Sequence, residues 1–80
     1  MFKSDKEFES AMKEILIYVR DEKPLDEFFK SVDYRNAFIE CDKRELLQGV
    51  LYFINEKGLP VIENCQPYIT YNGLKFIENN

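Results

Sequence analysis

The chain has 80 residues, of which 45% are hydrophobic and 15% aromatic, and its formal net charge at pH 7 is −4. A chain of this length supports one small core, so we expect residues 1–80 to form a single domain. No apolar run exceeds five residues, the length of residues 15–19, which is too short to cross a bilayer, and the N-terminus lacks the apolar segment of a secretory signal. We therefore expect a cytoplasmic protein with no membrane segment.

The chemistry-bearing residues do not predict an enzyme. The chain has two cysteines, Cys41 and Cys65, and no histidine, and two thiolates alone do not complete a tetrahedral metal site. Only Cys41 has basic residues close by in the sequence, Lys43 and Arg44. There is no nucleophile–base pair and no glycine-rich phosphate loop. We expect no catalytic residues, no metal and no cofactor, with both thiols reduced.

The first half of the chain predicts two helices. Ser4 and Glu7 have the spacing of a capping box, which predicts a helix from there to about Glu22. Pro24 suits the first turn of a second helix, because its missing N–H needs no partner there. The apolar face of that helix would be formed by Leu25, Phe28, Phe29 and Val32. Residues 33–41 fit either an extension of this helix or a turn and a brief strand, and we favour the turn and strand.

The second half predicts a third helix and a hairpin. Asp42 and Glu45 have capping-box spacing, and Gly58 suits the left-handed C-terminal cap. The core stripe of this helix would be Leu46, Leu47, Val50, Phe53 and Ile54. Residues 61–63 are then expected to pair with residues 67–69 in an antiparallel hairpin.

A short final helix follows the expected hairpin. Thr70 is a plausible N-cap, Gly73 lies in the first turn, and three apolar residues would pack back against the first helix: Leu74, Phe76 and Ile77. Residues 42–77, which end in an Ile-Thr-x-x-Gly-x-x-Phe-Ile segment, resemble the end of a winged helix-turn-helix domain, as in small bacterial and phage proteins of the YjcQ-like kind. The resemblance implies a mostly α (α+β) fold: a three-helix core, a two-stranded wing and a short final helix.

The winged-helix resemblance also implies double-stranded DNA as a partner. The outward face of the third helix would carry Arg44, Gln48, Tyr52 and Asn55, with Lys43 beside it to contact a phosphate. Arginine reads guanine, and glutamine or asparagine reads adenine, in the major groove. Against this, the chain is acidic, and residues 58–74 contain no lysine or arginine, whereas phosphate contacts supply most of the affinity for DNA.

A second function therefore remains open, that of a protein-interaction or assembly module on the same fold. Tyr52 would be a large aromatic side chain on the outer face of a helix, and such residues are common at interfaces. Ile17 would lie opposite the apolar stripe of the first helix, so that it is either covered within the monomer or part of a dimer. The resemblance implies a homodimer through the first and final helices. The two candidates are thus a DNA-binding or regulatory protein, with a phage or mobile element as a candidate source, and a non-enzymatic interaction module.

Overall fold

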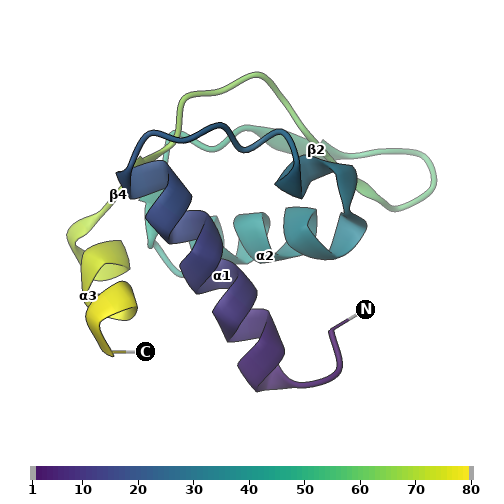
Figure 1. The fold of residues 1–80 in the computed structure, drawn as a ribbon. Helices are drawn as coiled ribbons and strands as arrows, with labels where there is room; N and C mark the ends of the chain where they lie inside the picture. Colours follow the sequence, from purple (N-terminus) through teal and green to yellow (C-terminus); the bar gives the residue numbers. More distant parts are fainter. Residues whose placement is uncertain (1, 80) are drawn as a thin grey trace.

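The computed structural model describes residues 2–79, which form three α-helices, one 3₁₀ turn and a long β-hairpin (Figure 1). The elements in chain order are α1 (Asp5–Arg20), η1 (Phe28–Lys30), α2 (Val32–Lys43), β1 (Leu47–Gln48), β2 (Tyr52–Ile54), β3 (Pro60–Ile62), β4 (Tyr68–Ile69) and α3 (Tyr71–Asn79). The expected class is confirmed: a mostly helical α+β fold with an antiparallel hairpin and a short final helix.

Helix α1 begins where its capping residues predict. The Ser4 side chain accepts a hydrogen bond from the backbone N–H of Glu7 at 3.2 Å. The helix ends at Arg20, and Glu22 follows in the left-handed region with a φ of 55°. This is the usual way to close a helix, although glycine is the residue that normally occupies the position.

The second predicted helix and the expected strand at residues 33–41 are both wrong. The segment after Pro24 forms only the short turn η1, and residues 33–41 lie inside α2. The local cause is Ser31, whose side chain accepts a hydrogen bond from the N–H of Tyr34 at 3.4 Å and so caps a new helix. The buried residues of α2 are Ala37, Phe38, Ile39 and Cys41.

The third predicted helix, from Asp42 to Gly58, is also wrong. Asp42 lies in the last turn of α2, and Glu45, with a φ of 61°, ends that helix. Gly58 has a φ of 79° but serves the turn of the hairpin. Residues 50–54 are five consecutive apolar residues, and a run of this length does not distinguish a strand from a helix by periodicity.

The hairpin consists of two short ladders with a bulge between them. Strand β2 pairs with β3, with Phe53 opposite Val61, and β1 pairs with β4, with Leu47 opposite Ile69. The expected pairing of residues 61–63 with 67–69 is therefore wrong, since each of these segments pairs with the preceding arm. Between the ladders, residues 63–67 lie opposite the shorter segment 49–51.

Gly49 allows the two arms to approach each other at this bulge. Its φ is 80°, and a Cβ atom there would lie only 3.0 Å from the carbonyl oxygen of Gln66. A side chain at this position would push the arms apart, so the glycine is needed for their close approach.

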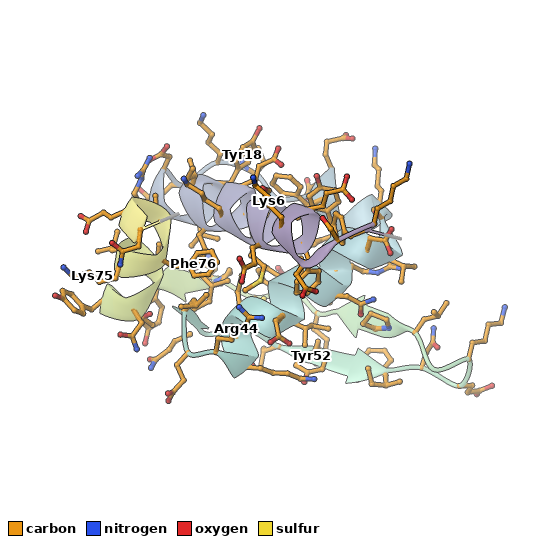
Figure 2. All side chains as sticks on the ribbon, turned by 90° about the horizontal axis from the view of Figure 1, so that it is seen from below. Lys6, Tyr18, Arg44, Tyr52, Lys75 and Phe76 are labelled. Carbon is orange, nitrogen blue, oxygen red and sulfur yellow. The ribbon has the colours of Figure 1, made fainter. Side chains whose placement is uncertain are left out.

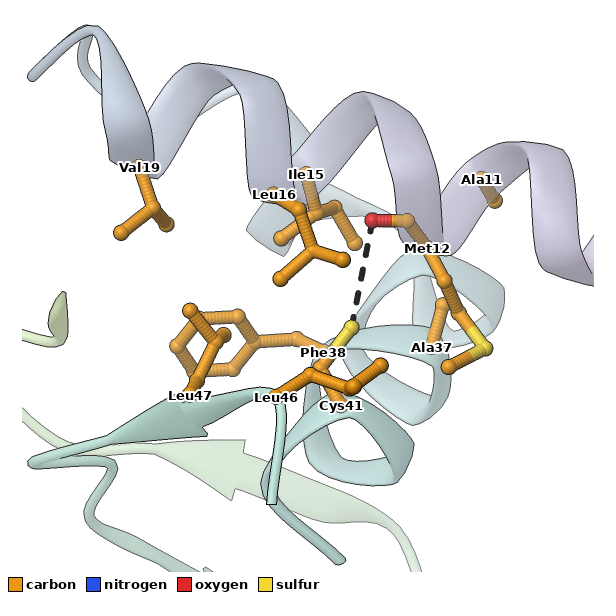
Figure 3. Packing of buried hydrophobic residues seen from close by; sticks show 10 residues of the cluster. All are labelled: Ala11, Met12, Ile15, Leu16, Val19, Ala37, Phe38, Cys41, Leu46 and Leu47. Atoms are coloured by element: carbon orange, nitrogen blue, oxygen red, sulfur yellow. Dashed lines mark hydrogen bonds between the residues drawn. The ribbon is translucent and has the colours of Figure 1, made fainter. Parts of the chain in front are cut away.

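The core lies between α1, α2 and the start of the hairpin (Figure 3). Its buried members are Ala11, Met12, Ile15, Leu16, Val19, Ala37, Phe38, Cys41, Leu46 and Leu47. Helix α3 lies beside α1, as expected (Figure 1). Phe76 and Ile77 pack against the core, whereas Leu74, which was also predicted to pack inward, is exposed. Thr70 caps α3 by accepting a hydrogen bond from the N–H of Gly73 at 3.0 Å, which confirms the predicted cap.

Candidate protein-interaction surface

The structure does not bring the five residues predicted to contact DNA onto one helix face. Lys43 is the last residue of α2, and Arg44 follows it as the C-cap. Gln48 lies on β1, Tyr52 on β2, and Asn55 in the turn of the hairpin. The predicted helix face is wrong because the helix that would have carried it is a pair of strands.

The polar groups of Arg44 and Gln48 are engaged within the chain. Arg44 Nε donates to Glu40 Oε2 at 2.9 Å, and Nη1 lies 3.6 Å from Glu9 Oε2. The hydrogen bond with Glu40 raises the pKa of Arg44 above its usual value. Gln48 Oε1 accepts a hydrogen bond from the hydroxyl group of Tyr68 at 2.6 Å. These contacts join the helices to each other and the two arms of the hairpin to each other.

Asn55 organises the tip of the hairpin. Its Oδ1 atom accepts hydrogen bonds from the backbone N–H groups of Lys57 at 2.9 Å and Leu59 at 3.0 Å. An asparagine side chain that bonds the backbone in this way stabilises a turn. The tip projects beyond the helices in both views of the molecule (Figures 1 and 2). The Asn55 side chain thus closes the turn between β2 and β3.

Four large apolar side chains between residues 51 and 59 are exposed, and we call them the hairpin surface: Leu51, Phe53, Ile54 and Leu59. Their exposed fractions are 54%, 49%, 57% and 38%. Phe53, Ile54 and Leu59 line one hollow of about 610 Å³ together with the turn residues. Phe53 and Ile54 were predicted to lie in the core, which is wrong. Contiguous exposed apolar residues are typical of interaction sites.

The hairpin surface has few charged residues around it. Residues 46–55 are all uncharged in a chain that is 32% charged, and the charged residues of segment 47–69 are Glu56, Lys57 and Glu63. Natural sheet edges usually carry charges, lysine above all, that prevent pairing with other chains. The β2 strand lacks this protection.

The two residues predicted for a partner interface lie on different elements. Tyr52 is on β2, opposite Ile62, and is half-buried. Ile17 is on α1 and is also half-buried. The residues of the hairpin surface were missed, although the uncharged run ending in an Asn-x-x-Gly turn signal could have indicated a hairpin arm.

The Cys41 thiol is buried in the core. Burial raises the pKa of Cys41 to about 12, and its Sγ atom lies 3.9 Å from the carbonyl oxygen of Met12 (Figure 3). Cys65 is half-buried, and both thiols are free. Residues 2–79 contain no group of three or more metal-ligating side chains that could hold a metal ion. Within the same residues, no helix has the length and apolar character to cross a membrane.

Comparison of the chain with protein-family models, with curated proteins and with solved structures finds no match.

Proposed function

We propose that this chain is a small, non-enzymatic protein-interaction module that binds another protein chain through the hairpin surface. The observation that carries the proposal is the exposure of four large apolar side chains on a projecting hairpin, three of which, Phe53, Ile54 and Leu59, line one hollow. Exposed apolar area is unfavourable in water, and a partner that covers it gains about 25 cal/mol for each Å² buried. Binding to a partner would remove this unfavourable exposure.

The expected strength of such an interaction is modest. Four side chains of this exposure present on the order of 300 Å² of apolar area, which corresponds to roughly 8 kcal/mol of gross stabilisation. Association costs about 4 to 15 kcal/mol of lost freedom, so the partner must add contacts of its own. Reversible binding in the micromolar range fits this arithmetic.

Charge supports a protein partner over DNA. Several basic side chains are paired with carboxylates, as in Arg20 with Asp21 at 2.9 Å and Lys30 with Glu27 at 3.0 Å. Lys57 is the one basic residue in segment 47–69. A DNA-binding hairpin needs several cations to neutralise phosphates, whereas an apolar surface on an acidic chain suits a protein partner.

Binding to the partner can be measured with two matched variants. The purified chain is immobilised and exposed to a lysate of its source cells, beside Phe53→Thr/Ile54→Thr and Tyr71→Thr. Tyr71 is 70% exposed and lies outside the hairpin. Threonine retains strand propensity, so the double variant keeps its fold while losing apolar area. We expect a protein captured by the wild type and the Tyr71 variant to be lost from the double variant. Equal capture by all three would contradict the proposal.

DNA binding in the manner of a winged-helix protein is the second candidate. The order of elements favours it, because α2 directly precedes a long hairpin and α3 follows, so that α2 takes the place of the third helix predicted from the sequence. Lys43 at the end of α2 and Lys57 at the tip would contact phosphates. Titration of duplex DNA followed by fluorescence anisotropy at low and moderate salt tests this candidate. If the chain binds DNA in this way, the wild type binds the duplex at low salt, and the Lys43→Ala and Lys57→Ala variants bind it more weakly.

A cytoplasmic location is part of the proposal. Cys41 and Cys65 are both free thiols, which is the state that a reducing compartment maintains. Cell fractionation with an antibody against the chain checks it.

A further inference from the structure

We propose that a second copy of this chain binds the hairpin surface, by antiparallel pairing of the two β2 strands. The inference rests on the proposed function and names the partner. Two copies would join their two-stranded sheets into one four-stranded sheet with the order β3, β2, β2 and β3.

The outer edge of β2 is open to such pairing. The backbone N–H of Glu63 donates to Leu51 O, and that of Asn55 donates to Leu59 O, each at 2.9 Å. Alternate residues of an antiparallel strand bond to a given neighbour, so the backbone groups of Tyr52 and Ile54 point away from β3. Within residues 2–79, β2 pairs with β3 alone. Helix α2 packs against β3, the other strand of this sheet.

The edge is self-complementary when the two-fold axis passes beside Phe53. Tyr52 of one copy then lies opposite Ile54 of the other, and each pair exchanges two backbone hydrogen bonds, which makes four in all. The two Phe53 residues face each other as a non-hydrogen-bonded pair, in which side chains approach most closely. Phe53 and its cross-strand neighbour Val61 point to the face of the sheet opposite Ile62, which packs against the core. The core therefore leaves the Phe53 face free.

The same register places no like charges together. Glu56 lies opposite Val50 of the other copy, Lys57 lies opposite Gly49, and Asn55 lies opposite Leu51. The charges of each tip thus meet the uncharged stretch 46–55 of the second copy. A second copy suits this edge better than a charged strand would, because the pairing strand must itself be uncharged to avoid burying an unpaired charge.

The dimer should be weak and reversible. Roughly 300 Å² of apolar area on each copy is below the ~800 Å² on each partner that a standard stable interface buries. We expect a dissociation constant on the order of 100 μM, so that the chain is monomeric when dilute.

Sedimentation velocity of the purified chain from about 10 μM to 1 mM tests the proposal. The variants are Ile54→Pro, Ile54→Lys and Ile17→Glu. Proline at position 54 removes an outward N–H without breaking a bond to β3, and lysine places a charge on the edge. Ile17→Glu is the matched control, because it alters the alternative interface through α1 and α3. We expect a concentration-dependent dimer whose dissociation constant rises at least about tenfold in both Ile54 variants and stays unchanged in Ile17→Glu.

Two results would overturn the proposal. One is a wild type that remains monomeric throughout the series, and the other is a dimer that withstands both Ile54 variants. Circular dichroism of each variant shows that the fold is retained. Capture of a different protein at low micromolar concentration, dependent on Phe53 and Ile54, would leave the proposed function intact in either case, so the two failures are separable.

Discussion

The hydroxyl group of Thr70 donates a hydrogen bond to the backbone carbonyl of Glu45, at 2.7 Å. The same hydroxyl oxygen accepts the N–H of Gly73, so one side chain caps α3 and ties it to the segment that ends α2. The backbone N–H of Thr70 also donates to Leu46 O at 3.1 Å. The two ends of the hairpin are therefore fastened together at the point where the chain returns to the helices.

Removal of the Thr70 hydroxyl should lower stability measurably. We expect Thr70→Ala to reduce the free energy of unfolding by about 1 to 2 kcal/mol, because it removes a helix cap and a second hydrogen bond. Thr70→Ser retains both bonds and should lose well under half as much. Urea unfolding followed by circular dichroism measures both variants, and equal losses in the two would contradict the role of the hydroxyl group.

Gly73 should tolerate no side chain. A Cβ atom there would collide with the carbonyl oxygen of Leu46 and lie 2.6 Å from Ile69 Cγ1. We expect Gly73→Ala to lower the free energy of unfolding by about 2 to 3 kcal/mol, since α3 would have to move off the hairpin. Asn72→Ala, one residue earlier in the same helix and exposed, is the control and should change stability by less than about 0.5 kcal/mol. A Gly73→Ala variant as stable as the control would show that a side chain fits between α3 and the hairpin at this position.

Glycine at position 22 should stabilise the chain. Glu22 has a φ of 55°, a conformation that glycine adopts without steric cost. We expect Glu22→Gly to raise the free energy of unfolding by about 0.5 to 1 kcal/mol. Glu27 has a right-handed helical backbone, and Glu27→Gly should instead lower it by a similar amount. Thermal unfolding of both variants measures whether stability rises in Glu22→Gly and falls in Glu27→Gly. A fall in both variants would contradict the prediction.

Stability should fall at alkaline pH because of Cys41. Burial raises the pKa of this thiol from 9.0 to about 12, so the unfolded chain releases the proton at a lower pH than the folded chain. The contribution of the protonated Cys41 thiol to the free energy of unfolding is fully present below about pH 9. It is lost as the pH rises towards 12, by about 1.4 kcal/mol per pH unit. Between pH 9 and 10.5 the wild type should lose about 2 kcal/mol more than Cys41→Ala. Urea unfolding at the two pH values measures the difference, and equal losses would mean that the thiol ionises within the fold.

The elements with local signals were predictable from the sequence. The cap at Ser4 predicted α1 and the cap at Thr70 predicted α3, because each depends on a hydrogen bond between neighbouring residues. The cap at Ser31 carries the same kind of signal, but the apolar spacing from Leu25 to Val32 suggested one helix running past it, followed by a turn and a strand. The periodicity of the apolar residues alone did not show that η1 and α2 are separate elements on either side of Ser31.

The hairpin and its exposed surface were not predictable in the same way. Phe53 and Ile54 fit the apolar stripe of a helix as well as they fit a strand, and the choice depends on pairing with residues 60–62. Their exposure depends on where the hairpin tip lies relative to the helices, which is a property of the tertiary structure. The polar residues predicted to form one DNA-binding face were dispersed for the same reason.

Site-specific photo-crosslinking at Phe53 tests the central claim most directly. Phe53 is replaced by p-benzoylphenylalanine in the cell, with the same replacement at the exposed Tyr71 of α3 as the control. The account predicts a protein adduct, either a second copy of the chain or another protein, that forms at position 53, is absent at position 71 and is lost when Ile54→Lys is added. A nucleic-acid adduct at position 53, or no adduct there at all, would contradict a protein-binding hairpin.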